Sequence, residues 1–162
     1  MTLIDLLRCT PEEHVLSYFN RAYGTSLSPH EVEVTSPVEY NGKTKVTITP
    51  RVRVGCSRTI LGSIDFIYDR LSVESVFGTS VAANVKFPIT TTDLMIQVGK
   101  TSGMIVVEND FVHEVIEDYN CFIAASPQSL RWKGGLFLGP PRDTRYHVGT
   151  LVGQNNLNGF VK

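Results

Sequence analysis

The sequence feature that most constrains this fold is a change in the hydrophobic period soon after residue 24. The segment TPEEHVLSYFNRAYG, residues 10–24, spaces its apolar residues as one face of an α-helix does. Those apolar residues are Val15, Leu16, Phe19 and Tyr23. Thr10 is suited to be the N-cap, Glu13 is placed for a capping box, and Gly24 is suited to end the helix. This segment therefore predicts an N-terminal helix.

After this helix the apolar residues recur at every second position, which is the period of a β-strand. Val32 and Val34 begin the alternation, and the dipeptide Asn41-Gly42 favours a two-residue hairpin turn. The strand after the turn is expected to place Val46, Ile48, Val52 and Val54 on one face and Thr47, Thr49, Arg51 and Arg53 on the other. Because Pro50 has no amide N–H, we expect an edge strand or a bulge there.

Three further segments predict β-strands: residues 62–73, 112–126 and 129–139. A second, shorter helix is predicted within residues 90–103, ending at Gly103. Together these elements predict an α+β fold. We expect a mostly antiparallel sheet, arranged as a sandwich or a partial barrel, with an N-terminal helix and a second short helix.

The length and composition suit one domain followed by a tail. A chain of 162 residues with 42% hydrophobic residues can bury a core, and we place a single structural domain at residues 1–145. Residues 146–162 are rich in Gly and Asn and predict an extended C-terminal tail. The apolar residues of the tail are Leu151, Val152, Leu157, Phe160 and Val161. They have little local structure to bury them, so we expect the tail to dock on a neighbouring subunit.

The charge pattern limits the classes of partner. The net charge is −1 and the Lys and Arg residues are scattered, which argues against nucleic acid as the main partner. No apolar run approaches the roughly 20 residues of a membrane-spanning helix, so no membrane partner is expected. The N-terminal sequence MTLIDLLRCT lacks the basic start and long apolar stretch of a signal peptide.

Neither the cysteines nor the histidines form a recognisable chemical motif. Three widely separated cysteines, Cys9, Cys56 and Cys121, are typical of reduced thiols that act as small buried hydrophobic residues. The four histidines, His14, His30, His113 and His147, lack the tight spacing of a zinc site. The segment VGKTSG has Leu94 where a phosphate-binding loop needs Gly. We therefore expect no metal and no cofactor.

Two features leave alternative functions open. Asp65 and Asp69 project from one predicted strand, so a small hydrolase could use them, or the acidic run near Glu117, as a general acid and base. The default interpretation of these carboxylates is a solvated strand face. The tryptophan Trp132, with Tyr40 and Tyr68, could instead form the platform of a carbohydrate- or host-surface-binding module.

Alternation around the tryptophan favours a structural role. In the segment SLRWKGG, residues 129–135, we expect Leu130 and Trp132 to face inward and Arg131 and Lys133 to face outward. The pair Gly134-Gly135 would then permit a bulge or a close approach of two backbones.

Four segments, in order, carry a resemblance to a known class of proteins. They are YGTSLSPHEV, PVEYNGKTKVTI, GSIDFIYDRLSV and AASPQSLRWKGGLFLG. Together they resemble small virion structural proteins of large contractile-tailed bacteriophages, over residues 2–139. The final segment RYHVGTLVGQNNLNGFVK lies outside that pattern.

The resemblance implies a non-enzymatic structural subunit of a tailed-bacteriophage virion, made as a reduced protein in the host bacterial cytoplasm. Its partners would be other virion proteins, in a homo- or hetero-oligomer within the particle. Head decoration, neck, tail and baseplate all remain open as locations. The resemblance supplies no catalytic residue.

Overall fold

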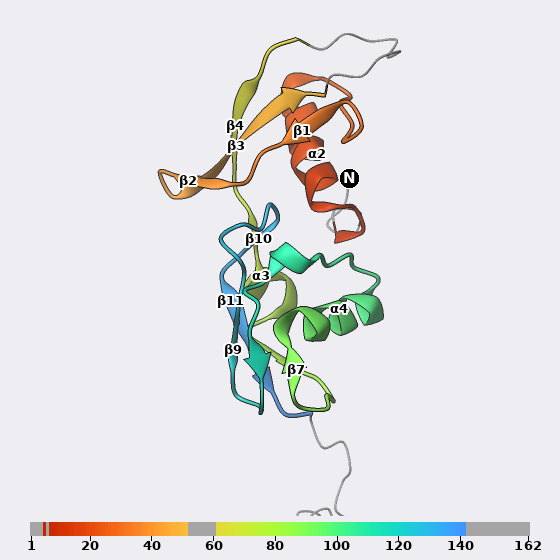
Figure 1. The fold of residues 1–162 in the computed structure, drawn as a ribbon, viewed down its shortest axis with the longest axis vertical. Helices are drawn as coiled ribbons and strands as arrows, with labels where there is room; N and C mark the ends of the chain where they lie inside the picture. The colour runs from red at the N-terminus through yellow and green to blue at the C-terminus, as the bar shows by residue number, and fades with distance from the viewer. Residues whose placement is uncertain (1–4, 6, 52–60, 142–162) are drawn as a thin grey trace, which may run out of the picture.

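The computed structural model describes residue 5, residues 7–51 and residues 61–141. Figure 1 shows an elongated molecule in which two groups of elements are stacked along the long axis. We call residues 10–69 the N-terminal lobe and residues 70–141 the C-terminal lobe. Both lobes combine helices with strands, and most of the strand pairs in the described residues are antiparallel, so the predicted α+β class is confirmed.

The first helix forms as its sequence signals predict. Helix α2 spans Pro11–Tyr23 and begins with a capping box. The Thr10 amide donates to Glu13 Oε2 at 2.7 Å, and the Glu13 amide donates to Thr10 Oγ1 at 3.3 Å. Gly24 ends the helix with φ 64°, a left-handed conformation that glycine adopts readily. The helix buries Val15, Leu16 and Phe19, whereas Tyr23 is half exposed.

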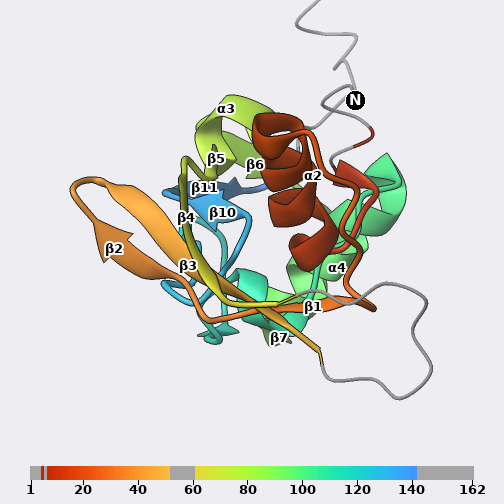
Figure 2. The same cartoon turned by 90° about the horizontal axis from the view of Figure 1, so that it is seen from above.

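The N-terminal lobe is a four-stranded antiparallel sheet with α2 packed on one face. Its strands are β1 (Val32–Val34), β2 (Val38–Tyr40), β3 (Lys43–Pro50) and β4 (Ile64–Tyr68). The predicted hairpin is present between β2 and β3, where Asn41 and Gly42 have φ values of 51° and 74°. Figure 2 shows this hairpin projecting away from the body of the molecule.

Strand β3 lies in the middle of this sheet. It pairs with β1 and β2 along one edge and with β4 along the other. The prediction of an edge strand or bulge at Pro50 is therefore wrong. The missing amide is tolerated because Pro50 is the last residue of β3, beyond the last pair with β4 at Ile48. Val46 and Ile48 are buried as predicted, and Val52 and Val54 lie outside the described residues.

The C-terminal lobe is built from short elements. Its helices are α3 (Val73–Phe77), α4 (Thr91–Ser102) and a 3-10 turn at Glu108–Asp110. Its strands are β5 (Leu71–Ser72), β6 (Ser80–Ala82), β7 (Ile89–Thr90), β8 (Val115–Ile116), β9 (Phe122–Ala124), β10 (Trp132–Lys133) and β11 (Gly135–Gly139). These strands form three small sheets: β10–β5, β6–β11–β9 and β7–β8.

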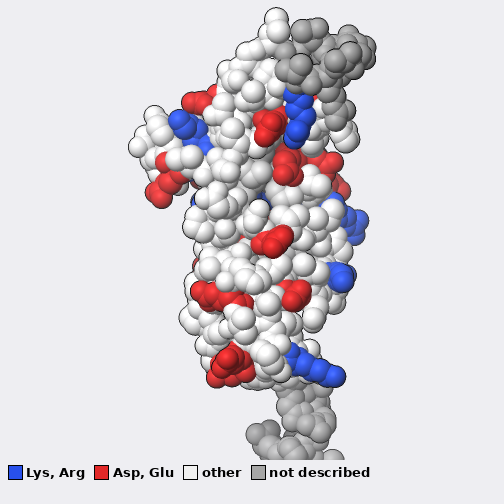
Figure 3. Space-filling model, viewed as in Figure 1, with Lys and Arg blue, Asp and Glu red and all other residues white. Residues whose placement is uncertain are grey.

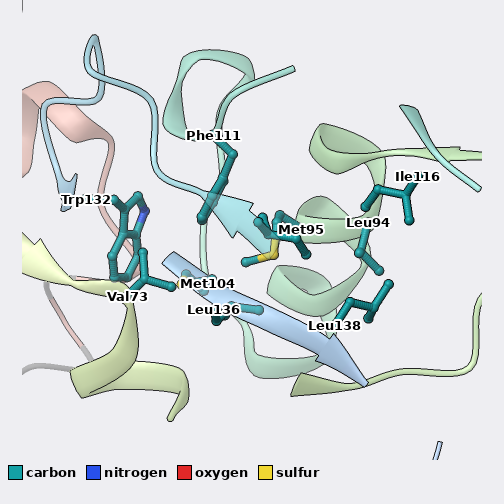
Figure 4. Packing of buried hydrophobic residues seen from close by; sticks show 10 residues of the cluster. Val73, Leu94, Met95, Met104, Phe111, Ile116, Trp132, Leu136 and Leu138 are labelled. Carbon is teal, nitrogen blue, oxygen red and sulfur yellow. The ribbon is translucent and has the colours of Figure 1, made fainter. Parts of the chain in front are cut away.

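Each lobe has its own hydrophobic cluster. In the C-terminal lobe, α4 contributes Leu94 and Met95, and β11 contributes Leu136 and Leu138. Figure 4 shows these side chains converging between the helix and the strand, with Trp132 at one end of the cluster. Helix α4 was predicted, and it ends at Gly103 as expected.

The arrangement of strands differs from the single sheet that the sequence suggested. In the described residues the strands are divided among four small sheets, because most of them are only two to five residues long. Helix α3 was not predicted. It is five residues long, which is too short to show a helical period in the sequence.

We predict that Gly135→Ala destabilises the protein by about 1–3 kcal/mol, because a Cβ there would overlap the carbonyl of Ile123 and the ring of Phe122. Gly139→Ala in the same strand is the matched control. A Cβ at that position would meet only Val81 O, at 3.8 Å, so its effect should stay within about 0.5 kcal/mol. Urea denaturation measures both values, and equal effects of the two substitutions would contradict this packing.

Candidate functional site

The junction between the lobes contains a fully buried arginine. Arg131 comes directly before β10 and has no exposed surface. Its Nη1 donates to the carbonyl of Ile105 at 2.9 Å, and its Nη2 donates to the carbonyl of Cys9. Arg131 therefore joins the chain entering α2 to the chain leaving α4.

Ser129 and Asp110 extend this polar network. The Ser129 hydroxyl donates to Asp110 Oδ1 at 2.8 Å, and it accepts from the amides of Arg131 and Trp132 at 3.2 and 3.0 Å. Asp110 Oδ2 accepts from the amide of Val107 at 3.0 Å. Both carboxylate oxygens are thus engaged inside the protein, and they hold residues 107–110 against residues 129–132.

Burial dominates the electrostatics of the network. It raises the pKa of Asp110, although the hydrogen bonds from Val107 and Ser129 and the charge of Arg131 act in the opposite direction. Burial also lowers the pKa of Arg131, and the nearby Asp110 opposes that change. The charge of each group therefore offsets part of the free-energy cost of desolvating the other.

A small polar pocket opens beside this network. Its volume is about 190 Å³, and both lobes line it, with Glu12 and Thr35 on one side and Asn109, Asp110 and Gln128 on the other. The Asp110 carboxylate already accepts hydrogen bonds from Val107 and Ser129. In the described part of the chain, no histidine is among the hydrogen-bond partners of the Ser129 hydroxyl, so its activation as a nucleophile is not seen. These contacts therefore brace residues 107–110 and 129–132 within the C-terminal lobe, and Arg131 links that lobe to Cys9 at the entrance of α2.

The structure corrects one prediction about the tryptophan segment and confirms another. Trp132 has no exposed surface and packs on Phe77 and Phe111, so its inward position is confirmed. Arg131 was expected to face outward and is buried instead. Strand β10 is only Trp132–Lys133, so the alternation of a strand does not extend back to Arg131.

The aromatic platform suggested for carbohydrate binding is not assembled. Trp132 is buried, and Tyr68 is 6% exposed with its hydroxyl donating to the carbonyl of Leu130 at 2.7 Å. Only Tyr40 of the three is substantially exposed, and the Lys45 ammonium lies over its ring at 5.6 Å from the centroid.

The two candidate catalytic carboxylates lie on the open face of the N-terminal sheet. Asp65 accepts from the Thr47 hydroxyl at 2.7 Å and from the Lys45 ammonium at 3.3 Å, and these contacts lower the pKa of its carboxyl. Asp69 forms ion pairs with Lys43 and Lys133 at 3.9 and 3.6 Å. A general acid needs a raised pKa, so the lowered pKa of Asp65 and its exposed position favour the solvated strand face.

The remaining candidate groups are dispersed. Glu117 and Asp118 are exposed in the turn between β8 and β9. Across residues 5, 7–51 and 61–141, no group of three or more His, Cys, Asp or Glu residues is arranged to hold a metal ion. Burial raises the pKa of the Cys9 and Cys121 thiols, and Cys56 lies outside the described residues.

An apolar groove in the C-terminal lobe was not predicted from the sequence. It has a volume of about 410 Å³ and lies between α4, the end of α3 and the segment that follows β6. From the sequence alone, the segment FGTSVAANVKFP, residues 77–88, predicts a loop or an irregular strand and no groove. The tail residues Leu151, Val152, Leu157, Phe160 and Val161 lie outside the described residues.

We predict that Arg131→Met lowers the free energy of unfolding by about 3–5 kcal/mol, because it leaves the Cys9 and Ile105 carbonyls without their donor and the buried Asp110 without the nearby positive charge. Lys133→Met is the matched control two residues away. Lys133 is exposed, so its loss should change stability by less than about 1 kcal/mol. Chemical denaturation compares the two, and a small effect at Arg131 would overturn its bridging role.

We also predict that Asp110 makes stability depend on pH. Its pKa is raised in the folded protein above the ordinary 3.8, so its contribution to stability is complete below pH 3.8 and is lost as the pH rises through the folded pKa. Asp110→Asn removes this dependence. The free energy of unfolding of the natural protein, relative to that of the variant, should therefore fall as the pH rises above the ordinary pKa of 3.8 toward neutral pH. Denaturation curves across this range test the sign, and a rising difference would contradict it.

Comparison with known proteins places the chain in a family without assigning an activity. No curated protein and no solved structure matches this sequence. A family model matches residues 5–161, which is nearly the whole chain and includes the apolar residues of the tail. The chain therefore belongs to the family of unknown function DUF7941.

Proposed function

We propose that this protein is a non-enzymatic structural subunit of a tailed-bacteriophage virion and works by binding neighbouring protein subunits. The observation that carries this proposal is the presence of exposed apolar side chains on both lobes. Contiguous exposed apolar surface commonly marks a protein-binding site. The virion assignment is supported by the resemblance of the four sequence segments.

The patch on the N-terminal lobe lies on the sheet face opposite α2. We define it as Val38, Tyr40 and Ile67, which are 59%, 46% and 43% exposed. Val38 and Ile67 flank Lys45 on the neighbouring strands, so the three positions share one face. Lysines and aspartates surround this N-terminal patch, which is suited to a partner with mixed charges.

The patch on the C-terminal lobe is an aromatic pair. Phe122 of β9 and Phe137 of β11 are cross-strand partners with ring centroids 5.1 Å apart. They are 48% and 53% exposed. Half-exposed phenylalanine rings are suited to the desolvated centre of a protein interface.

The charge distribution also supports a protein partner. Figure 3 shows acidic and basic side chains interspersed over both lobes on the face in view. Binding to nucleic acid depends on a concentrated basic surface. No helix in the described parts of the chain is long and apolar enough to cross a membrane.

We expect a chain that lacks residues 147–162 to keep its two folded lobes but to be lost from purified particles, because the apolar tail docks on a neighbouring subunit. Quantitative mass spectrometry of the particles measures incorporation, and circular dichroism with thermal melting measures folding. Normal incorporation of the truncated, folded chain would contradict the role of the tail.

The double variant Asp65→Asn, Asp69→Asn is the control for this experiment. It alters two exposed carboxylates and leaves the tail and both apolar patches unchanged. The variant should be incorporated as the natural chain is. If particle production instead depended on these two carboxylates while incorporation stayed normal, the non-enzymatic assignment would fail.

A further inference from the structure

The apolar groove of the C-terminal lobe has the size and lining of a binding site. Its volume of about 410 Å³ falls within the roughly 300–1,000 Å³ that is typical of ligand pockets. The apolar side chains that line it are Phe77, Val81, Ala83, Val85, Leu94 and Val98. They come from α3, α4 and the segment beginning at β6, so one wall of the groove is an extended chain.

That extended wall has the side-chain pattern of a strand. Val81, Ala83 and Val85 are half-buried against the core, whereas Ala82 and Asn84 between them are exposed. The alternation has a period of two, which is the side-chain pattern of a strand and continues beyond the end of β6 at Ala82.

The backbone of this segment has unused hydrogen-bonding groups. Strand β6 is at the edge of its sheet, and its pairing with β11 ends at Ala82 and Gly139. Residues 84–86 form no backbone hydrogen bond with another described residue. An extended edge of this kind is suited to strand addition by a peptide.

The protein's own strand β11 cannot continue its parallel ladder with β6 into residues 84–86. Pro140 and Pro141 follow Gly139 directly, and neither has an amide N–H to donate. The edge beyond Ala82 is therefore left to a different segment.

The C-terminal tail has the chemistry of such a segment. Leu157, Gly159 and Val161 share one face when the tail is extended, and Phe160 lies on the other. The tail contains no Pro and no acidic residue between 149 and 161. The family model continues through residue 161, so the matched region includes this part of the tail.

We propose that residues 80–86 and the adjoining apolar groove receive the C-terminal tail, residues 151–161, of another copy of this chain by strand addition. The inference rests on the proposed function, because it names the receiving site for the assembly contact. Main-chain hydrogen bonds to residues 84–86 would give affinity, and the groove would select the apolar side chains. Each subunit would then hold one neighbour's tail and give its own to the next, which is a head-to-tail contact.

Photo-crosslinking of the full chain tests this contact. We would place p-benzoylphenylalanine at position 84, where the exposed Asn84 lines the groove, and mix equal amounts of ¹⁴N- and ¹⁵N-labelled protein. We expect mixed-isotope crosslinks between position 84 and residues 151–161, with a yield that rises with protein concentration. The same probe at exposed Glu39, in β2, should give no crosslink to the tail.

A matched pair of tail variants tests specificity without altering either lobe. Leu157→Asp with Val161→Asp should reduce the crosslink yield at least about tenfold, because a charged side chain loses the free energy that burial of the apolar side chain would supply. Asn155→Asp with Asn158→Asp adds the same charge and should leave the yield within about twofold, a difference of less than 0.5 kcal/mol.

The possible failures are distinguishable. Same-isotope crosslinks with a yield independent of concentration would mean that each chain binds its own tail, and would overturn the proposal. Absence of any crosslink to residues 151–161 would also overturn it. If truncation of the tail still abolished incorporation into particles, the proposed function would survive and only this receiving site would be lost.

Discussion

The buried guanidinium of Arg131 is the interaction on which the arrangement of the two lobes depends. It donates to carbonyls from the start of α2 and from the segment after α4, and the Asp110 carboxylate lies in the same network. Burying a charge costs free energy, which its partners must offset. Here Nη1, Nη2 and the nearby charge of Asp110 provide that compensation, whereas the buried Nε has no hydrogen-bond partner among the described residues. The position of residues 129–132 is therefore fixed from several directions at once, and Tyr68 adds a further contact at Leu130.

Local signals in the sequence were sufficient to predict the elements whose stability is local. The capping box at Thr10 and Glu13, the turn at Asn41-Gly42 and the helix end at Gly103 each depend on residues a few positions apart. These features follow from backbone geometry and short-range hydrogen bonds, which do not need the rest of the fold. The strand faces of β3 were predicted for the same reason, since its length of eight residues makes the alternation clear.

The polar junction and the apolar groove could not be predicted because their parts are far apart in the chain. Arg131 and Cys9 are separated by 122 positions, and nothing near either residue indicates the other. The alternating burial of residues 81–85 depends on α4 packing beside them, so the sequence alone could not separate a receiving edge from a loop. Asp65 and Asp69 are the opposite case, because their spacing in the sequence suggested a catalytic pair. In the structure each carboxylate instead forms ion pairs with lysines that come from other strands.

The long separation between Arg131 and Cys9 also imposes an order on folding during synthesis. The fully buried residues of the cluster formed by α2 and strands β1–β4 all lie within residues 15–68, so the N-terminal lobe can collapse early, before Leu130 packs against it. The carbonyl of Cys9 must then wait for a residue synthesised 122 positions later before it gains its partner. Until then, the surface that becomes the interior of the junction is exposed on the partly synthesised chain. Such transiently exposed surface is prone to aggregation.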